Sequence, residues 1–140
     1  MLSQLAQSAS TTRPCFRVHK NGTNQTGGFG TSATKLTWST EDFDTNSNFA
    51  SDKFTPTVAG KYLLHVKIHS AGGPSDQKLI SAQIHKNGSL YARNDNSQSG
   101  SQGFGVEMTT IADANGSTDY FEVYAFTDNA SSVDVNGTAT

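Results

Sequence analysis

The stretch KYLLHVKIH, residues 61–69, decides the fold class of this chain. Apolar side chains stand at every second position, and this set is Tyr62, Leu64, Val66 and Ile68. The positions between them hold Leu63, His65, Lys67 and His69. Because successive side chains of a β-strand point to opposite faces, the alternation predicts a strand with one buried face. The Gly-Gly-Pro sequence at 72–74 then ends the strand, since Gly and Pro interrupt a β-ladder.

Segments on both sides of residues 61–69 show related patterns. The clearest further strands are predicted at 79–86, 104–111 and 119–126. Weaker indications come from Phe16 with Val18, from Leu36 with Trp38, and from extended pieces around Phe49, Phe54 and Val58. No segment keeps a helical period over three turns. Many short strands separated by turn residues predict an all-β sandwich or barrel.

Asn87-Gly88 predicts a hairpin, because both positions of a tight hairpin turn favour positive φ. A strict two-residue loop would pair Ala82 with Arg93, which would place an arginine on the apolar face. We therefore expect a β-bulge or a longer loop in this hairpin.

The predicted strand at 119–126 is apolar on both faces. Phe121, Val123 and Ala125 form one face, and Tyr120, Tyr124 and Phe126 form the other. A strand of this kind is usually covered on both sides. The second cover is either a loop of the same chain or a neighbouring subunit. We favour the subunit, because aromatic side chains contribute much of the energy of such contacts, so Tyr120, Tyr124 and Phe126 are the candidate trimer-interface residues.

The composition limits the classes of function. A chain of 140 residues is long enough for one domain. Its 10 Lys and Arg residues are scattered and the net charge is -2, so neither a nucleic acid nor an anionic membrane surface is an expected partner. The sequence contains no run of 18 apolar residues, so we expect no helix that crosses a membrane. The single cysteine, Cys15, opens an apolar run and is expected to be a small buried side chain.

No motif indicates catalysis or a cofactor. On a strand, the four-residue spacing of His65 and His69 separates them by about 13 Å, too far for one metal ion. Asp44 begins a segment like a calcium loop, but Phe49 and Thr55 stand where that loop needs Gly and Glu, so an Asp- and Asn-rich turn is the better interpretation. We therefore expect no enzymatic activity, no metal and no cofactor.

The segment from Phe43 to Tyr62 resembles a known family. It reads FDTN at 43–46, Phe49, and then DKFTPTVAGKY at 52–62. This order resembles the signature of the complement-1q globular-head family, within the tumour-necrosis-factor-like jelly rolls. The residues that match the signature are Phe49, Phe54, Gly60 and Tyr62. The resemblance covers roughly residues 15–140 and implies a jelly-roll β-sandwich of about ten antiparallel strands that forms a homotrimer.

The sequence FTPTVAG at 54–60 is most similar to that of phage and environmental-virus members of that family. The resemblance therefore implies a virion structural protein: a trimeric capsid decoration or cement protein, or a short fibre, on the exterior of a phage particle. The alternatives are a receptor- or glycan-binding tip of a tail fibre, which would bind a host-surface glycan or receptor, and a secreted complement-1q-like binding module located outside the cell.

We expect two parts of the chain. Residues 1–14 would be an arm that attaches to a capsid or tail protein, and residues 15–140 would be the jelly roll. Family members usually end in an aromatic strand on the trimer side, whereas this chain ends NGTAT at 136–140. The expected jelly roll therefore either lacks its last strand or has another element in its place.

Overall fold

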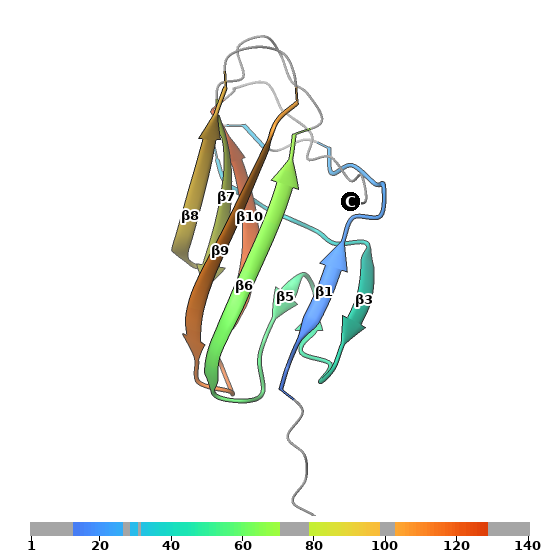
Figure 1. The fold of residues 1–140 in the computed structure, drawn as a ribbon, viewed down its shortest axis with the longest axis vertical. Coiled ribbons are helices and arrows are strands. Elements are labelled where there is room, and N and C mark those ends of the chain that lie inside the picture. Colours follow the sequence, from blue (N-terminus) through green and yellow to red (C-terminus); the bar gives the residue numbers. More distant parts are fainter. Residues whose placement is uncertain (1–12, 27–28, 31, 71–78, 99–102, 129–140) are drawn as a thin grey trace, which may run out of the picture.

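A computed structural model describes residues 13–26, 29–30, 32–70, 79–98 and 103–128 (Figure 1). Within these ranges it has ten β-strands and no helix. They are β1 (Phe16–His19), β2 (Thr34–Lys35), β3 (Thr40–Asp44), β4 (Phe49–Ala50), β5 (Lys53–Phe54), β6 (Gly60–His69), β7 (Leu79–Lys86), β8 (Ser89–Ser97), β9 (Gly105–Ala114) and β10 (Phe121–Thr127). Every pairing between them is antiparallel, which confirms the predicted all-β fold.

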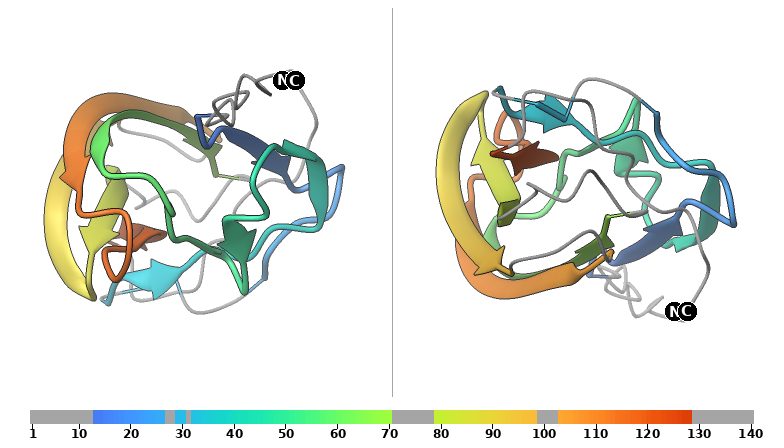
Figure 2. Two further views of the ribbon diagram at one scale, coloured as in Figure 1. Left: turned by 90° about the horizontal axis from the view of Figure 1, so that it is seen from below. Right: turned by 90° about the horizontal axis from the view of Figure 1, so that it is seen from above.

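The strands form a sandwich-like arrangement of two layers. The larger sheet has the order β4-β5-β10-β7-β8, and β2 also pairs with β10. The opposite layer consists of two separate pairs, β6-β9 and β1-β3. The views along the long axis show β6 and β9 lying across from β7 and β10, with the interior between them (Figure 2).

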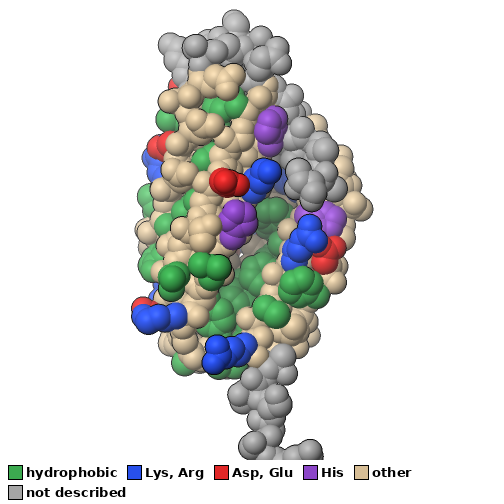
Figure 3. Space-filling model, in the orientation of Figure 1, with side chains coloured by type: hydrophobic (Ala, Val, Ile, Leu, Met, Phe, Trp, Pro, Cys, Tyr) green, Lys and Arg blue, Asp and Glu red, His purple; other side chains and the backbone are tan. Residues whose placement is uncertain are grey.

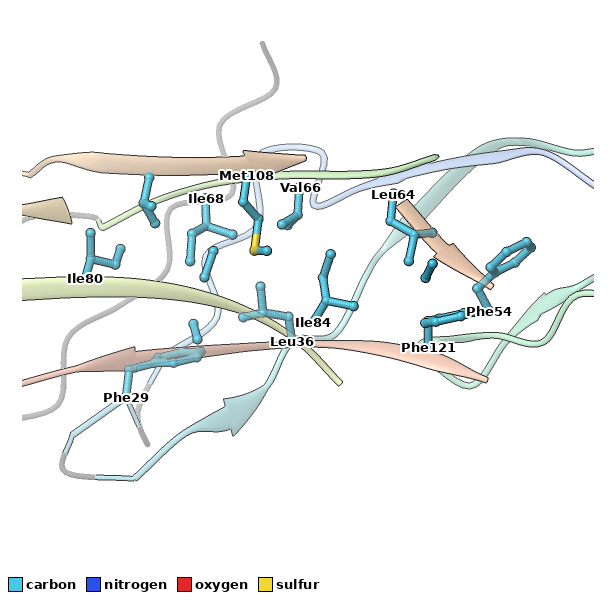
Figure 4. Packing of buried hydrophobic residues seen from close by; sticks show 14 of the residues in the cluster. Phe29, Leu36, Phe54, Leu64, Val66, Ile68, Ile80, Ile84, Met108 and Phe121 are labelled. Carbon is cyan, nitrogen blue, oxygen red and sulfur yellow. The ribbon is translucent and has the colours of Figure 1, made fainter. Parts of the chain in front are cut away.

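The core between the layers follows the predicted alternation. Leu64, Val66 and Ile68 of β6 are all at least nine-tenths buried. They point toward Ile84 of β7 and the neighbouring side chains of the larger sheet (Figure 4). The expectation from residues 61–69 is confirmed, because one face of β6 is buried and the other is exposed along its length.

Aromatic rings from the resemblance signature pack together at one end of the core. The ring centroid of Phe54 lies 4.5 Å from that of Phe16 and 5.5 Å from that of Tyr62. Phe49 stacks on Phe16 at 4.9 Å. The Tyr62 hydroxyl donates a hydrogen bond to the Val58 carbonyl at 2.5 Å, and burial raises the pKa of Tyr62. These residues therefore have a structural role in joining β1, β5 and β6.

The β7–β8 hairpin contains the expected bulge. Asn87 and Gly88 both have positive φ, at 53° and 78°. The register shifts between Ile84 and His85, so that Arg93 pairs with Gln83 instead of Ala82. The shift keeps Arg93 off the apolar face, and it resolves the conflict that the sequence poses.

The prediction for Cys15 is wrong. Cys15 is exposed, while the preceding Pro14 is buried and the following Phe16 packs on the aromatic cluster. Because the ring of Phe16 fixes which face of β1 points inward, the neighbouring Cys15 points outward. Its backbone N–H donates to the Thr45 hydroxyl at 3.0 Å.

Two predictions fall largely on residues outside the described ranges. The proposed attachment arm, residues 1–14, is described only at its last two residues. The segment after β10 is described only as far as residue 128, so the question of a last strand is not answered by the described strands.

Candidate functional site

The outer face of the β6–β9 pair carries an exposed apolar pair. Leu63 and Ile111 lie directly opposite each other in the register of the two strands. Their exposed fractions are 70% and 60%. Directly opposed side chains on one face of an antiparallel pair are close neighbours, so these two lie side by side as one apolar surface.

Charged residues surround this pair in matched positions. Lys61 lies opposite Asp113 in the register, and its Nζ atom is 2.8 Å from Asp113 Oδ1. This ion pair raises the pKa of Lys61. Further along the strands, Lys67 lies opposite Glu107. Because each of these charges has an opposite partner on the neighbouring strand, the face as a whole has little net charge.

Tyr91 of β8 extends the apolar surface beyond β9. Its hydroxyl donates to the Ile111 carbonyl at 3.1 Å, and the side chain is 44% exposed. We call Leu63, Ile111 and Tyr91 the β6–β9 patch. Hydrophobic side chains also gather over the lower parts of β6 and β9 in the space-filling view (Figure 3).

The sequence did not single out the β6–β9 patch. Its signal was nevertheless present, because Leu63 and Ile111 are the apolar residues that stand out of phase in their alternating strands. Their proximity depends on the register between β6 and β9, which the alternation of each strand alone does not specify.

The predicted interface residues lie on the opposite side of the molecule and are only partly exposed. Tyr124 stacks on His85 with ring centroids 4.0 Å apart. The Lys53 ammonium lies 4.7 Å from the ring centroid of Tyr120, and the Arg93 guanidinium lies 5.8 Å from that of Phe126. Each aromatic ring is thus partly covered by a side chain of its own chain, and the role of the three in an interface stays a prediction.

Tyr124 also has polar contacts within the chain. Its hydroxyl lies 3.5 Å from Glu122 Oε2, and Glu122 forms an ion pair with Lys35 at 2.8 Å. Burial, followed by the charge of Glu122, raises the pKa of Tyr124. This outer face of β10 is therefore a network of partly buried side chains that satisfy one another.

A groove runs between β1 and β6. Its cavity has a volume of about 570 Å³ and is lined by residues 16–20 on one side and 63–68 on the other. Leu36, Ile84 and Phe121 lie at its base. The space-filling view shows this hollow, with hydrophobic side chains visible inside it (Figure 3).

Lys20 is the most buried cation beside the groove. Its ammonium donates to Gln25 Oε1 at 2.8 Å and to the Thr37 carbonyl at 2.7 Å. Burial lowers the pKa of Lys20, and the nearby charge of Asp52 opposes that effect. Because its hydrogen bonds hold the loop residues around it, Lys20 has a structural role.

The described residues contain no group of three or more His, Cys, Asp and Glu side chains that could hold a metal ion. His65 and His69 are both exposed on the outer face of β6, as the sequence predicts. Asp44 accepts hydrogen bonds from the backbone N–H groups of Asn46 and Phe49, which confirms the turn interpretation of that segment. In the same part of the chain no helix is long and apolar enough to cross a membrane.

Comparisons with known proteins do not assign this chain to a family. No protein-family model matches the chain, and no curated protein shows significant similarity to it. The resemblance of residues 43–62 to the complement-1q globular-head signature therefore enters the functional argument as a hypothesis.

Proposed function

We propose that this chain is a non-enzymatic structural module of a virus exterior that assembles as a homotrimer through the outer face of β6 and β9. The observation that carries the proposal is the opposed pair Leu63 and Ile111, which is largely exposed in the single chain. Large apolar side chains that lie together on a surface mark an interaction site.

The character of this face supports contact between identical copies. The charges beside the patch are already matched within the chain, as in the pair Lys61 and Asp113. Two or three copies can therefore approach through this face without a net repulsion between like charges. The ladder of β6 and β9 is ten residues long on each strand, which provides about 33 Å of surface in one direction.

The trimeric state and the virion setting rest on the resemblance of the FDTN and DKFTPTVAGKY segments to phage-type jelly rolls. In the structure the matching residues Phe49, Phe54 and Tyr62 pack between strands, which is compatible with a fold signature. A capsid or tail protein remains the proposed partner of the N-terminal segment.

The mass of the chain in solution tests this proposal. We expect a particle of three chains for the unmodified chain and a single chain of 14.9 kDa for the variant Leu63→Asp, because burying an unpaired carboxylate in the contact is unfavourable. Phe43→Asp is the matched control. Phe43 is 47% exposed on β3, across the groove from β6, and this variant should remain trimeric.

Tyr124→Asp distinguishes the two candidate faces. If Tyr124→Asp yields folded single chains while Leu63→Asp stays assembled, the interface lies on the outer face of β10 and the assignment to β6 and β9 is wrong. If the unmodified chain is a monomer at micromolar concentration, the homotrimer itself is ruled out.

A further inference from the structure

We propose that Asn21 is a site of spontaneous modification, at which the side-chain amide is lost as ammonia and a carboxylate takes its place. The tetrapeptide HKNG occurs twice in the chain, at 19–22 and at 85–88, and each copy forms a tight turn. The Asn and Gly of the first copy have φ angles of 48° and 80°, and those of the second copy have 53° and 78°. Because the two turns share their sequence and these φ angles, a difference in reactivity between their asparagines comes from their surroundings.

An Asn-Gly pair undergoes this reaction without an enzyme or a cofactor. The backbone nitrogen of Gly22 attacks Cγ of Asn21, so that a bond forms between these two atoms and closes a succinimide ring. The bond between Cγ and Nδ2 breaks, and Nδ2 leaves as ammonia with the proton that the Gly22 nitrogen loses. Water then opens the ring at either of its carbonyl groups, which yields aspartate or isoaspartate. Glycine favours the attack because it has no Cβ to hinder the approach.

The side chain of Asn21 is free to rotate into the position for attack. Asn21 is exposed, and among the described residues its side-chain amide has no hydrogen-bond partner. Only its backbone N–H is bonded, to Nδ1 of His19 at 3.1 Å. A Cβ placed on Gly22 would meet no other part of the described chain within 4 Å, so the space beside the attacking nitrogen is open.

The side chain of Asn87, in the second copy of the turn, is held at both ends. Its Oδ1 atom accepts a hydrogen bond from the Tyr120 N–H at 3.0 Å, and its Nδ2 atom donates to Asp119 Oδ1 at 2.8 Å. The amide has to rotate before Gly88 can attack it, and this rotation breaks both bonds. Losing two hydrogen bonds of ordinary strength lowers the population of the reactive conformation at least about tenfold.

A third Asn-Gly pair is held more tightly still. The Oδ1 atom of Asn115 accepts hydrogen bonds from the backbone N–H groups of residues 117–119, at 2.9 to 3.0 Å. Its Nδ2 atom donates to the Thr118 hydroxyl at 2.7 Å. A Cβ placed on Gly116 would clash with the backbone of Ala59, so the space beside this nitrogen is closed. The three pairs therefore rank in reactivity, with Asn21 the fastest and Asn115 the slowest.

The modification would change the turn that follows β1. Each conversion adds one negative charge to a chain whose net charge is -2. The Lys20 carbonyl accepts hydrogen bonds from the Thr23 N–H at 3.0 Å and from the Ser39 hydroxyl at 2.6 Å. Isoaspartate at position 21 lengthens the main chain between Lys20 and Thr23, so the bond that closes the turn would be lost.

A time course of the unmodified chain in mildly alkaline buffer, under conditions in which it stays folded, tests the proposal. Peptide mapping by mass spectrometry follows each Asn-Gly pair separately, including the pair at 136–137, which lies outside the described residues. We expect Asn21 to convert at least about tenfold faster than Asn87 in the folded chain. In urea that unfolds the chain the difference should vanish, since the same four residues stand at both sites.

The variant Asp119→Ala tests the cause of the protection. It removes the acceptor of the Asn87 amide, so the conversion of Asn87 should become about fivefold faster. The rate at Asn21 in the same molecule should stay unchanged, and it reports any general loosening of the fold. Asp113→Ala removes an exposed carboxylate that is bonded to Lys61, and this matched control should change neither rate.

Four outcomes would overturn the proposal. Equal conversion of Asn21 and Asn87 in the folded chain would mean that the side-chain bonds of Asn87 give no protection. No conversion of Asn21 in the folded chain would mean that the turn itself protects both copies. A faster rate at Asn21 that persists in urea would assign the difference to the sequence and not to the fold. An unchanged rate at Asn87 in the Asp119→Ala chain would rule out the bond to Asp119 as the cause.

Discussion

The two outer faces of the sandwich differ in how far their apolar side chains are covered by other side chains. On β10, Tyr124 stacks on His85 and Phe126 lies under Arg93, so side chains of the same chain cover the rings in part. On β6 and β9, Leu63 and Ile111 lie opposite each other in the register and remain largely exposed. An apolar residue on the outward-facing side of a strand therefore predicts that another group covers it. The pattern does not predict whether that group belongs to the same chain or to another chain.

This difference between the two faces shows that the number of apolar residues on the outward side of a strand is a poor guide to an interface. The outer face of β10 has more aromatic area, yet His85 and Arg93 come from the neighbouring β7 and β8 to cover it. The β6–β9 pair has no further strand beyond β6 among the described residues, so Leu63 gains no such cover. The smaller apolar group is therefore the more exposed one.

The largest expected effect separates the faces by folding stability. Tyr124→Ala should lower the free energy of unfolding by about 2 kcal/mol, because it removes a partly buried ring and its stacking on His85. Leu63→Ala should change it by less than about 0.5 kcal/mol in the monomer, since that side chain is mostly exposed. Urea unfolding at a protein concentration low enough to keep the chains single would measure both values. Equal losses would contradict the contrast between the faces.

A smaller effect is expected from removing one cover on β10. Arg93→Ala should expose the ring of Phe126 and lower the free energy of unfolding by about 0.5 kcal/mol, the value typical of a cation–π contact near the surface. Arg93→Lys keeps the charge and much of the aliphatic cover, so it should lose less. The same urea experiment measures both variants, and a loss from Arg93→Lys as large as that from Arg93→Ala would show that the guanidinium itself is required.

Strands with a long alternating pattern were predictable from the sequence. Residues 61–69 and 79–86 were predicted as strands, and the structure has them at 60–69 and 79–86. The pattern works there because burial on one face depends only on local alternation. β2, β4 and β5 have two residues each, too few for a period, and their positions depend on pairing with distant strands.

The candidate site was less predictable for the same reason. The patch at Leu63 and Ile111 exists only because the register places them opposite each other. The partial cover of Tyr124 by His85 likewise depends on the pairing of β7 with β10. The error at Cys15 has a local cause, since an apolar neighbour such as Phe16 fixes the inward face and turns the adjacent residue outward. Patterns within one segment therefore predict strands better than they predict surfaces.

The smallest expected effect is a pH dependence on the outer side of β8. Arg93 Nε donates to Asp95 Oδ1 at 2.6 Å, and this hydrogen bond lowers the pKa of Asp95 in the folded chain. Because the pKa is lower in the folded than in the unfolded chain, the bond stabilises the fold above the unfolded pKa of about 3.9. That contribution to stability is lost as the pH falls through the pKa of Asp95 in the folded chain. The hydrogen bond between Arg93 and Asp95 weakens over the same pH range.

Melting temperatures at pH 5 and pH 3 would measure this effect. The unmodified chain should lose more stability between the two pH values than Asp95→Asn, which has no carboxylate to protonate at that position. Asp119→Asn is the matched comparison, because Asn87 and Lys86 lower the pKa of Asp119 in the same direction at the β7–β8 turn, away from Phe126. If Arg93→Ala shows the same pH dependence as the unmodified chain, the Arg93–Asp95 bond does not contribute to it, and the cover over Phe126 is independent of the charge on Asp95.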